Sequence, residues 1–299
     1  MNKKIFLFSL LLISSCSATS SFPEYSKTGR GTINHFKTKV RLPKEKIVIC
    51  ALGDTGTGEE GQREVARSLK ADSCTHILHL GDIIYPFGIK SDTDPQLGPK
   101  FFDHYGDLLE GGTELLLTMG NHDRYFRGVI SPWLKLAKKH KNLIYPQIFY
   151  SYQIYDLCIF SIDTNRFFKE QTIWLKKALK TKGCRIKIGM THFPFASSGR
   201  HGRPPTSIRN FLKNNLLGKL DMLFSGHDHN LADEGVFLGT RQIISGAGAK
   251  TRSLRSQRAP FVKSMLGHVS LRFREGKWRY FFKNTQTKTQ HEGIVSSKP

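Results

Sequence analysis

Short, nearly continuous runs of apolar residues are spread along this chain, and they constrain its fold more than any other feature. A continuous run predicts a strand buried on both faces, because a half-exposed strand alternates apolar with polar residues. The predicted strands are 46–52, 75–80, 114–119, 157–162, 185–190 and 221–224, and the predicted helices between them are 60–70, 99–109, 131–140, 171–180 and 207–217. Alternating strands and helices are typical of an α/β fold with right-handed crossovers.

The pattern changes after His229, where short strands are separated by turns. A hairpin is predicted for 269–273 and 278–282 around Glu275-Gly276, and these strands are expected to form a second, more antiparallel sheet. A chain of 299 residues is long enough for one large domain, which we place at 45–285, with a polar tail at 286–299.

The amino terminus has the features of an export signal at 1–15, where Lys3 and Lys4 precede a short apolar run. The run ends at Cys16 in a pattern that resembles the lipobox of bacterial lipoproteins, so we expect Cys16 to carry a lipid anchor. Residues 17–44 are polar and basic, and they are expected to form a tether. The protein would then be a cell-envelope lipoprotein facing the periplasm or the exterior. Cleavage near Ala18 would instead give a soluble periplasmic or secreted protein.

The chain is strongly basic, with a formal net charge of +22. From Arg241 to the end there are 13 Lys or Arg residues and two acidic residues. Such a field attracts anions. An anionic lipid surface or phosphorylated substrates would account for it, as would a solvated basic face. No specific nucleic-acid partner is expected, because no recognition motif for nucleic acid is evident.

Four further cysteines lie in or beside apolar runs, where a free cysteine often behaves as a small hydrophobic residue. We expect them to be free, and only Cys158 and Cys184 are placed so that they would be able to pair.

Side chains that bind hard metal ions follow five of the apolar runs, in the motifs GDTG, GDIIY, GNHD, THF and GHDH. In α/β sheets, ligands collect at the carboxyl ends of strands. The donors are oxygen and imidazole nitrogen, which suit iron, manganese or zinc and do not suit a thiolate-bound structural zinc. The candidate metal ligands are Asp54, Asp82, Tyr85, Asn121, His192, His227 and His229.

From about residue 47 to residue 249, these motifs resemble the calcineurin-like metallophosphoesterases, and specifically the purple acid phosphatases of the tartrate-resistant type. Two features carry the resemblance to that subgroup: Tyr85 stands three residues after Asp82, and no histidine stands two residues after Asp54. The resemblance implies a four-layer αββα sandwich of two mixed sheets flanked by helices. It also implies hydrolysis of phosphate monoesters, of small molecules or proteins, by an acid phosphatase.

The resemblance implies a binuclear centre as well. Asp54, Tyr85 and His229 would bind Fe(III), and Asp82 would bridge the two metal ions. The second ion would be a divalent iron, zinc or manganese, and its remaining ligands would be Asn121, His192 and His227. Two anions and a bridging carboxylate offset the charge of a trivalent ion, whereas neutral donors suit a divalent one.

Three further residues are candidates for catalysis. The resemblance places His201 at the position of a substrate-facing histidine, so we expect it to act as the general acid. His122, which Asp123 is expected to orient, would bind phosphate. Arg200 stands where the family typically has glutamate, and its guanidinium is suited to holding phosphate as a bidentate partner.

The family's mammalian members carry an inhibitory loop after the strand that ends in Asp-Thr, and this chain passes from Asp163-Thr164 to Gln171 without one. We therefore expect activity without proteolytic processing. Two alternatives stay open: a phosphodiesterase or nucleotidase of the same fold, and a non-catalytic surface protein that binds anions. His76 and His79 are interpreted as structural, and 246–248 as a tight turn. Asp163 is interpreted as structural or as a residue that supports the metal ligands without binding the metal.

Overall fold

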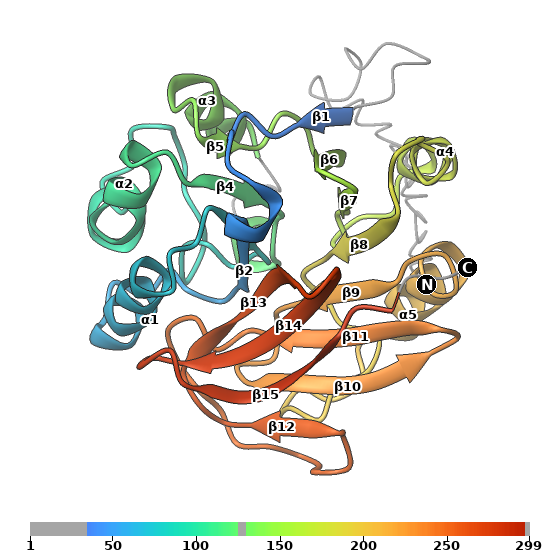
Figure 1. Cartoon of the computed structure of the whole chain (residues 1–299). Coiled ribbons are helices and arrows are strands. Elements are labelled where there is room, and N and C mark those ends of the chain that lie inside the picture. The colour runs from blue at the N-terminus through green and yellow to red at the C-terminus, as the bar shows by residue number, and fades with distance from the viewer. Residues whose placement is uncertain (1–34, 125–129, 297–299) are drawn as a thin grey trace, which may run out of the picture. The chain divides into compact units, whose positions relative to one another are not determined.

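Two mixed β-sheets form the centre of the molecule in a computed structural model, which describes residues 35–124 and 130–296 (Figure 1). The first sheet has the order β1-β6-β7-β8-β9-β11-β10-β12. Its strands are β1 (His35–Lys37), β6 (Tyr150–Ile154), β7 (Leu157–Ser161), β8 (Ile186–Met190), β9 (Met222–Ser225), β10 (Leu231–Phe237), β11 (Thr240–Ser245) and β12 (Phe261–Lys263).

The second sheet has the order β15-β14-β13-β2-β3-β4-β5. Its strands are β2 (Val48–Leu52), β3 (His76–His79), β4 (Glu114–Leu117), β5 (Leu143–Ile144), β13 (Gly267–Arg274), β14 (Lys277–Asn284) and β15 (Thr289–Ile294). Strands β2 to β5 pair in parallel, as do β7, β8, β9 and β11. Every residue of β2, β3, β4 and β7 is buried, as the continuous apolar runs predict.

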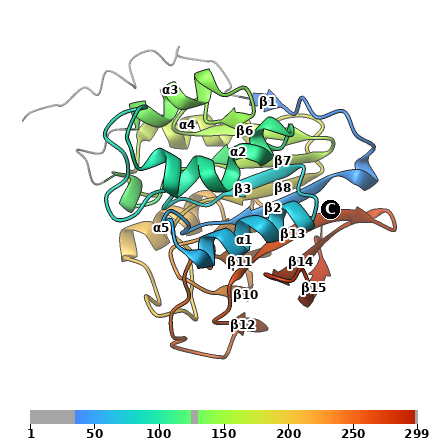
Figure 2. The same cartoon turned by 90° about the vertical axis from the view of Figure 1, so that its left-hand side faces the viewer.

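Helices cover the outer faces of the two sheets. They are α1 (Glu60–Ala71), α2 (Asp103–Glu110), α3 (Ser131–Lys139), α4 (Lys169–Ala178) and α5 (Thr206–Asn215). Figure 1 shows α1, α2 and α3 beside the second sheet and α4 and α5 beside the first, and Figure 2 shows the same layers after a quarter turn. The α/β class with two mixed sheets between helices is confirmed. A π-helical turn (Gly98–Phe102) precedes α2, and 3-10 turns lie at Lys44–Lys46 and His122–Arg124.

The carboxyl-terminal strands differ from the prediction in one respect. The hairpin of β13 and β14 is confirmed, but the strands after His229 do not form a sheet of their own. β10, β11 and β12 extend the first sheet, whereas β13 pairs with β2 and extends the second. The physical reason is that β2 and β9 are the outer strands of the parallel sets formed before His229. Each offers an unpaired edge, which β13 satisfies at β2 and β11 satisfies at β9.

The predicted catalytic domain, 45–285, is also too short at both ends. The expected tail, 286–299, contains β15, which pairs with β14, and Val295 is buried. The expected tether, 17–44, contributes β1, which pairs in parallel with β6. The described residues on both sides of the predicted domain, 35–44 and 286–296, therefore belong to the same compact unit.

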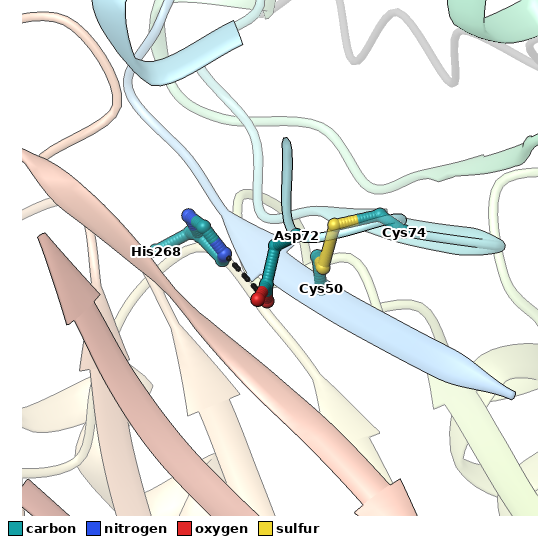
Figure 3. Close-up of side chains that lie close together, drawn as sticks. All are labelled: Cys50, Asp72, Cys74 and His268. Carbon is teal, nitrogen blue, oxygen red and sulfur yellow. Dashed lines mark hydrogen bonds and ion pairs between the residues drawn. A yellow bond between two sulfur atoms is a disulfide. The ribbon is translucent and has the colours of Figure 1, made fainter. Parts of the chain in front are cut away.

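The expectation of free cysteines is wrong. Cys50 is bonded to Cys74, and Cys158 is bonded to Cys184. In Figure 3, Asp72 and His268 lie next to the first disulfide, 3.2 Å apart between Oδ2 and Nε2. Asp72 also accepts a hydrogen bond from Arg272. Because both sulfurs are consumed in the disulfide, this cluster has no thiolate with which to bind a metal ion.

A buried carboxylate joins the two sheets. Glu114, the first residue of β4, accepts hydrogen bonds from the Tyr152 hydroxyl of β6 (2.8 Å) and from the Thr38 hydroxyl (2.7 Å). The backbone amide of Lys39 and the ring of His76 complete its partners. Burial raises the pKa of Glu114, but the hydrogen bonds from His76 and these donors outweigh it and lower the pKa to about 2.

Among the residues that the structure describes, no helix has the length and apolar character needed to cross a bilayer. The predicted signal at 1–15, the lipidation site Cys16 and the first part of the tether lie outside the described residues.

Candidate metal centre

The seven candidate ligands follow the carboxyl ends of five strands taken from both sheets. Asp54 follows β2, Asp82 and Tyr85 follow β3, and Asn121 follows β4. From the first sheet, His192 follows β8, and His227 and His229 follow β9. The structure therefore brings two halves of the chain together at one place, as the strand pattern predicts.

Tyr85 lies at the middle of one half of the cluster. Its hydroxyl lies 2.9 Å from Asp82 Oδ2, 3.1 Å from Asp54 Oδ1 and 3.2 Å from His229 Nε2. Asp54, Tyr85 and His229 are thus in mutual contact, and Asp82 touches the same phenol.

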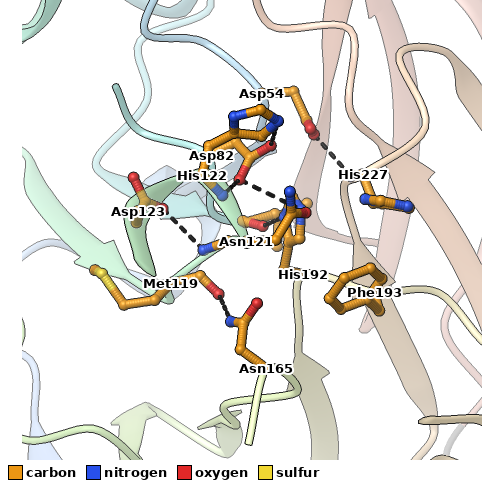
Figure 4. A network of polar contacts seen from close by, with 12 residues as sticks. Asp54, Asp82, Met119, Asn121, His122, Asp123, Asn165, His192, Phe193 and His227 are labelled. Atoms are coloured by element: carbon orange, nitrogen blue, oxygen red, sulfur yellow. Dashed lines mark hydrogen bonds and ion pairs between the residues drawn. The ribbon is translucent and has the colours of Figure 1, made fainter. Parts of the chain in front are cut away.

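His192 connects the other half of the cluster to Asp82. Its Nε2 lies 3.0 Å from Asn121 Oδ1 and 3.5 Å from Asp82 Oδ1. Figure 4 shows Asp54, Asp82, Asn121, His192 and His227 facing a common region. His227 donates its backbone amide to Asp54 Oδ2 (2.9 Å), and its ring packs 5.3 Å from the ring of His192 between centroids.

The backbone is strained at three of the ligands. The φ angles of Asp54, Asp82 and His227 are 59°, 53° and 71°, in the left-handed region that non-glycine residues seldom adopt. Such strain costs on the order of 1–3 kcal/mol at each residue and persists where the surrounding structure imposes it, often at functional sites.

Glycines next to the ligands leave room for the carboxylates. An ideal Cβ built on Gly120 would lie 2.0 Å from Asp82 Oδ1, and one built on Gly226 would lie 2.4 Å from Asp54 Oδ2. These are the glycines of GNHD and GHDH, so the motifs need them for packing as well as for turns. Gly246, in the segment predicted to be a tight turn, also lies against Asp54, because its Cβ would come within 2.8 Å of Oδ2.

The electrostatics of the cluster fit a bound cation. Burial, followed by the charge of Asp82, raises the pKa of Asp54 well above its usual range. Burial and the charges of Asp54 and Asp82 raise the pKa of Tyr85. One phenol hydrogen cannot serve Asp54 and Asp82 together, so the chain by itself supplies too few positive groups for these anions. A metal ion would supply the missing charge.

Burial favours the neutral form of three candidate histidine ligands. Burial lowers the pKa of His192, lowers that of His227 to about 2, and lowers that of His229 to about 4. The Nδ1 of His192 lies 2.9 Å from the carbonyl oxygen of Leu80, which fixes a tautomer with the Nε2 lone pair directed at Asn121 and Asp82. Two acceptors that face each other in this way are suited to a shared cation.

The candidate catalytic residues lie at the edge of this cluster. His122 Nε2 lies 3.9 Å from Asp82 Oδ2, and its Nδ1 lies 2.6 Å from the carbonyl oxygen of Pro86. The ring of His201 packs 4.5 Å from the ring of His227 between centroids. Arg200 is exposed beside His201, and it forms no ion pair within the part of the chain that the structure describes.

Asp123 does not have the role expected for it. Its carboxylate accepts hydrogen bonds from the backbone amides of Gly120 (2.8 Å) and Ile83 (2.9 Å), so it ties the loop after β4 to the loop after β3. Burial and the charge of Asp82 raise the pKa of Asp123 to about 8. His122 is instead held by Pro86.

Two residues that contact the candidate site were missed by the sequence reasoning. Asp228, fully buried inside GHDH, accepts a hydrogen bond from the His201 amide (2.8 Å) and another from the Ser197 hydroxyl. Arg252 lies with Nη1 3.4 Å from His201 Nε2. The GHDH motif itself gave a signal for Asp228, but nothing in the local sequence pointed to Arg252, which is 51 residues from His201.

The structural interpretation of the remaining residues agrees with their contacts. His76 lies beside Glu114, and His79 lies 2.9 Å from the Thr55 hydroxyl. Asp163 is buried, pairs with Arg124 and accepts a hydrogen bond from the Asn165 amide (2.8 Å).

The chain is similar to a family of known proteins. A model of the calcineurin-like phosphoesterase family matches residues 47–231. Tartrate-resistant acid phosphatase type 5 of Mus musculus is 25% identical over 245 residues, which cover 69% of this chain and 73% of that protein. The protein of the same name from Homo sapiens is 25% identical over 215 residues, covering 62% of this chain and 65% of that one.

Solved structures share the fold. One is GAP50, described as the anchor in the inner membrane complex of Plasmodium, with a TM-score of 0.68, 19% identity and coverage of 85% of this chain and 89% of that one. Another is a dimetal phosphatase from Danio rerio, with a TM-score of 0.56, 10% identity and coverage of 85% and 100%. With its motifs, its fold and a family match over more than half of its length, this chain belongs to the calcineurin-like phosphoesterase family.

Proposed function

We propose that this protein is an acid phosphatase that hydrolyses phosphate monoesters at a binuclear metal centre. Family membership supports metal-dependent hydrolysis of phosphoesters, and the finer assignment rests on one observation: the Tyr85 hydroxyl contacts Asp54, Asp82 and His229 together. A tyrosine in that position is the feature that resembles the purple acid phosphatases.

Asp54, Tyr85 and His229 would hold the ferric ion, and Asp82 would be shared by both ions. Asn121, His192 and His227 would complete the site of a divalent iron, zinc or manganese. When bound, two such ions would polarise the phosphate and make a bound water more acidic. The raised pKa values of Asp54 and Tyr85 support the assignment of the trivalent ion here, because a strong positive charge is needed to keep both groups ionised.

His201 would donate a proton to the leaving alkoxide. Its position beside His227 supports this role, since the ring then faces the proposed divalent site. Arg252 Nη1 lies next to His201 Nε2, and the guanidinium would donate hydrogen bonds to a phosphate oxygen. His122, on the other side of Asp82, would bind phosphate. Arg200 would reach the phosphate from the solvent side.

The second candidate function is that of a phosphodiesterase or nucleotidase, and a group of exposed arginines near His201 favours it. Two loops are tied together where the amides of Arg255 and Ser256 both donate to the carbonyl of Ser198. Within the described residues, their exposed arginines form no ion pairs: Arg200, Arg203, Arg252, Arg255 and Arg258. Comparing turnover of an aryl monoester with that of a bis-aryl diester separates the two activities.

The alternative from another class is a non-catalytic protein that binds anions at a cell surface. The Plasmodium neighbour described as an anchor has the same fold, so the fold alone does not establish turnover. The complete set of ligand side chains favours catalysis. Metal content without hydrolysis of any phosphoester would restore the alternative.

We propose further that the protein is exported and anchored by lipid at Cys16. Two disulfides support export, because disulfides persist in oxidising compartments and are rare in the cytosol. Mass spectrometry of the mature amino terminus tests the anchor, and an unmodified terminus near Ala18 would favour the soluble periplasmic or secreted form.

The visible spectrum of the purified protein tests the metal assignment. A phenolate bound to ferric iron gives a violet charge-transfer band, which Tyr85→Phe should abolish. Tyr155→Phe is the matched control, because Tyr155 is exposed and its hydroxyl donates to the carbonyl of Leu42, away from the cluster. An active protein without iron and without colour would move this chain to another branch of the family.

A further inference from the structure

A cavity lies away from the metal centre, between α3, β1, β5 and β6. Its volume is about 530 Å³, and four lysines line it: Lys37, Lys39, Lys138 and Lys141. All four lysines are exposed, and no acidic residue is among the described residues that line the cavity. Within the described parts of the chain, none of these lysines forms an ion pair with a carboxylate. The rim of the cavity is therefore an uncompensated positive field.

The wall of the cavity is apolar. It includes Phe36, Leu134, Ile144 and Pro146, of which Phe36 keeps 36% of its surface exposed. Apolar surface inside a ring of lysines suits a ligand that is anionic at one part and apolar at the next. A free phosphate ion would use the lysines and leave the apolar wall in contact with water.

The cavity and the metal centre lie at opposite ends of β4. Lys39, on the rim, donates its backbone amide to Glu114, which is the first residue of β4. Leu143, in the wall, pairs with Leu115 at the same end. Asn121, by contrast, follows the carboxyl end of β4. A surface bound at the cavity would leave the metal centre open to solvent.

The covalent chain brings this cavity near the proposed anchor. The described chain begins at His35, one residue before Phe36 of the wall, and 18 residues separate His35 from Cys16. A segment of that length reaches at most about 60 Å, and about 25 Å on average if it is a flexible coil. An anchor at Cys16 would therefore keep the lysines within reach of the membrane.

We infer that this cavity is a docking surface for an anionic phospholipid bilayer, in which the lysines bind headgroup phosphates and the apolar wall contacts the acyl region. The inference goes beyond phosphoester hydrolysis, and it does not depend on that activity.

Flotation with lipid vesicles tests it, with the full chain carrying Cys16→Ser so that no acyl group contributes. The vesicles contain either phosphatidylcholine alone or phosphatidylcholine with phosphatidylglycerol. The test variant is Lys37→Glu with Lys141→Glu. The control is Lys263→Glu with Lys288→Glu, because it changes the net charge by the same amount. Both lysines are exposed; Lys263 ends β12 and Lys288 precedes β15, and Figure 1 shows these two strands far from α3 and β1.

We expect the parent chain and the control to bind vesicles with phosphatidylglycerol, and to bind less as salt rises. The test variant should lose at least about 25-fold in partition, since each of its two lysines contributes roughly fivefold near an anionic surface. All chains keep the same amino terminus, so the difference between them reports the cavity. Unchanged melting temperatures and circular dichroism exclude a folding defect.

Three results would overturn the inference. The first is equal partition of test and control variants, which would make the attraction a property of net charge. The second is competition by inorganic phosphate at constant ionic strength, which would assign the cavity to a small anion. The third is a dimer in sedimentation that the test variant loses, without vesicle binding, which would assign the cavity to a second copy of the chain.

Discussion

Gly120→Ala should disable the proposed metal centre without unfolding the protein. The added Cβ would lie 2.0 Å from Asp82 Oδ1 and 2.3 Å from the Asp82 backbone nitrogen. Carbon atoms of this kind need about 3 Å, so the carboxylate and the backbone behind it must retreat by roughly 1 Å. Rotation of the Asp82 side chain cannot relieve the contact between the added Cβ and the Asp82 backbone nitrogen.

The size of the effect follows from that shift. Ligand distances at a metal tolerate about 0.2 Å, so a retreat of 1 Å removes Asp82 as a shared ligand. We expect loss of at least one metal ion per chain and a fall in turnover of about 100-fold or more. Overpacking of this kind also lowers the free energy of unfolding by about 1–3 kcal/mol.

The matched control is Gly106→Ala in α2, where an added Cβ meets no heavy atom within 4 Å. Alanine in a helix interior should raise stability by up to about 1 kcal/mol and leave the metal content unchanged. The assays are metal analysis, turnover of an aryl phosphate and urea unfolding with a chelator present. Gly120→Ala protein with both metals and turnover within threefold of the parent would refute this account of the site.

Other parts of the structure make further predictions. Glu114→Gln should lower the free energy of unfolding by about 3 kcal/mol at pH 7, because the pKa near 2 lies about 2.5 units below that of an unfolded glutamate. Since the pKa of Glu114 is depressed in the folded protein, this stabilisation is complete above about pH 5 and is lost as the pH falls towards 2. The free energies of unfolding of parent and variant, measured with urea, should therefore converge in acid. A difference between them that does not change with pH would contradict the depressed pKa. Replacing Cys158 and Cys184 by serine should cost about 3–4 kcal/mol for a loop of 26 residues, with thiol alkylation before and after reduction as the check that the bond exists. Limited proteolysis should not raise turnover, because β7 passes to α4 without an inhibitory loop; a many-fold rise would disprove this.

Much of the site was predictable from the sequence because each ligand is local to a strand end. A buried strand followed by glycine and a carboxylate, amide or imidazole can be recognised in four or five residues. Parallel strands then place their carboxyl ends at one edge of a sheet, so the strand pattern alone predicts that the seven ligands converge. The same reasoning predicted the α/β alternation and the hairpin of β13 and β14.

Other features required the tertiary structure, because they depend on contacts between residues far apart in the chain. Arg252 lies beside His201 only because the loops after β8 and β11 are tied together by backbone hydrogen bonds. Cys50 and Cys74 pair because β2 and β3 are neighbours in parallel register, and spacing alone does not show this. The tail became β15 because the edge of β14 offers unpaired backbone groups.

The sequence by itself therefore determined the α/β class, the donor atoms of the candidate site and the strand ends that carry them. The reason is that the spacing of apolar residues and the type of each residue are local properties of the chain. Tertiary structure alone decided which sheet the carboxyl-terminal strands join, which cysteines pair, and which glycines lie against Asp54 and Asp82. It also decided that Lys37 and Lys141, 104 positions apart, surround one apolar cavity. These features arise from burial and from pairing between distant segments, and no short stretch of residues encodes them.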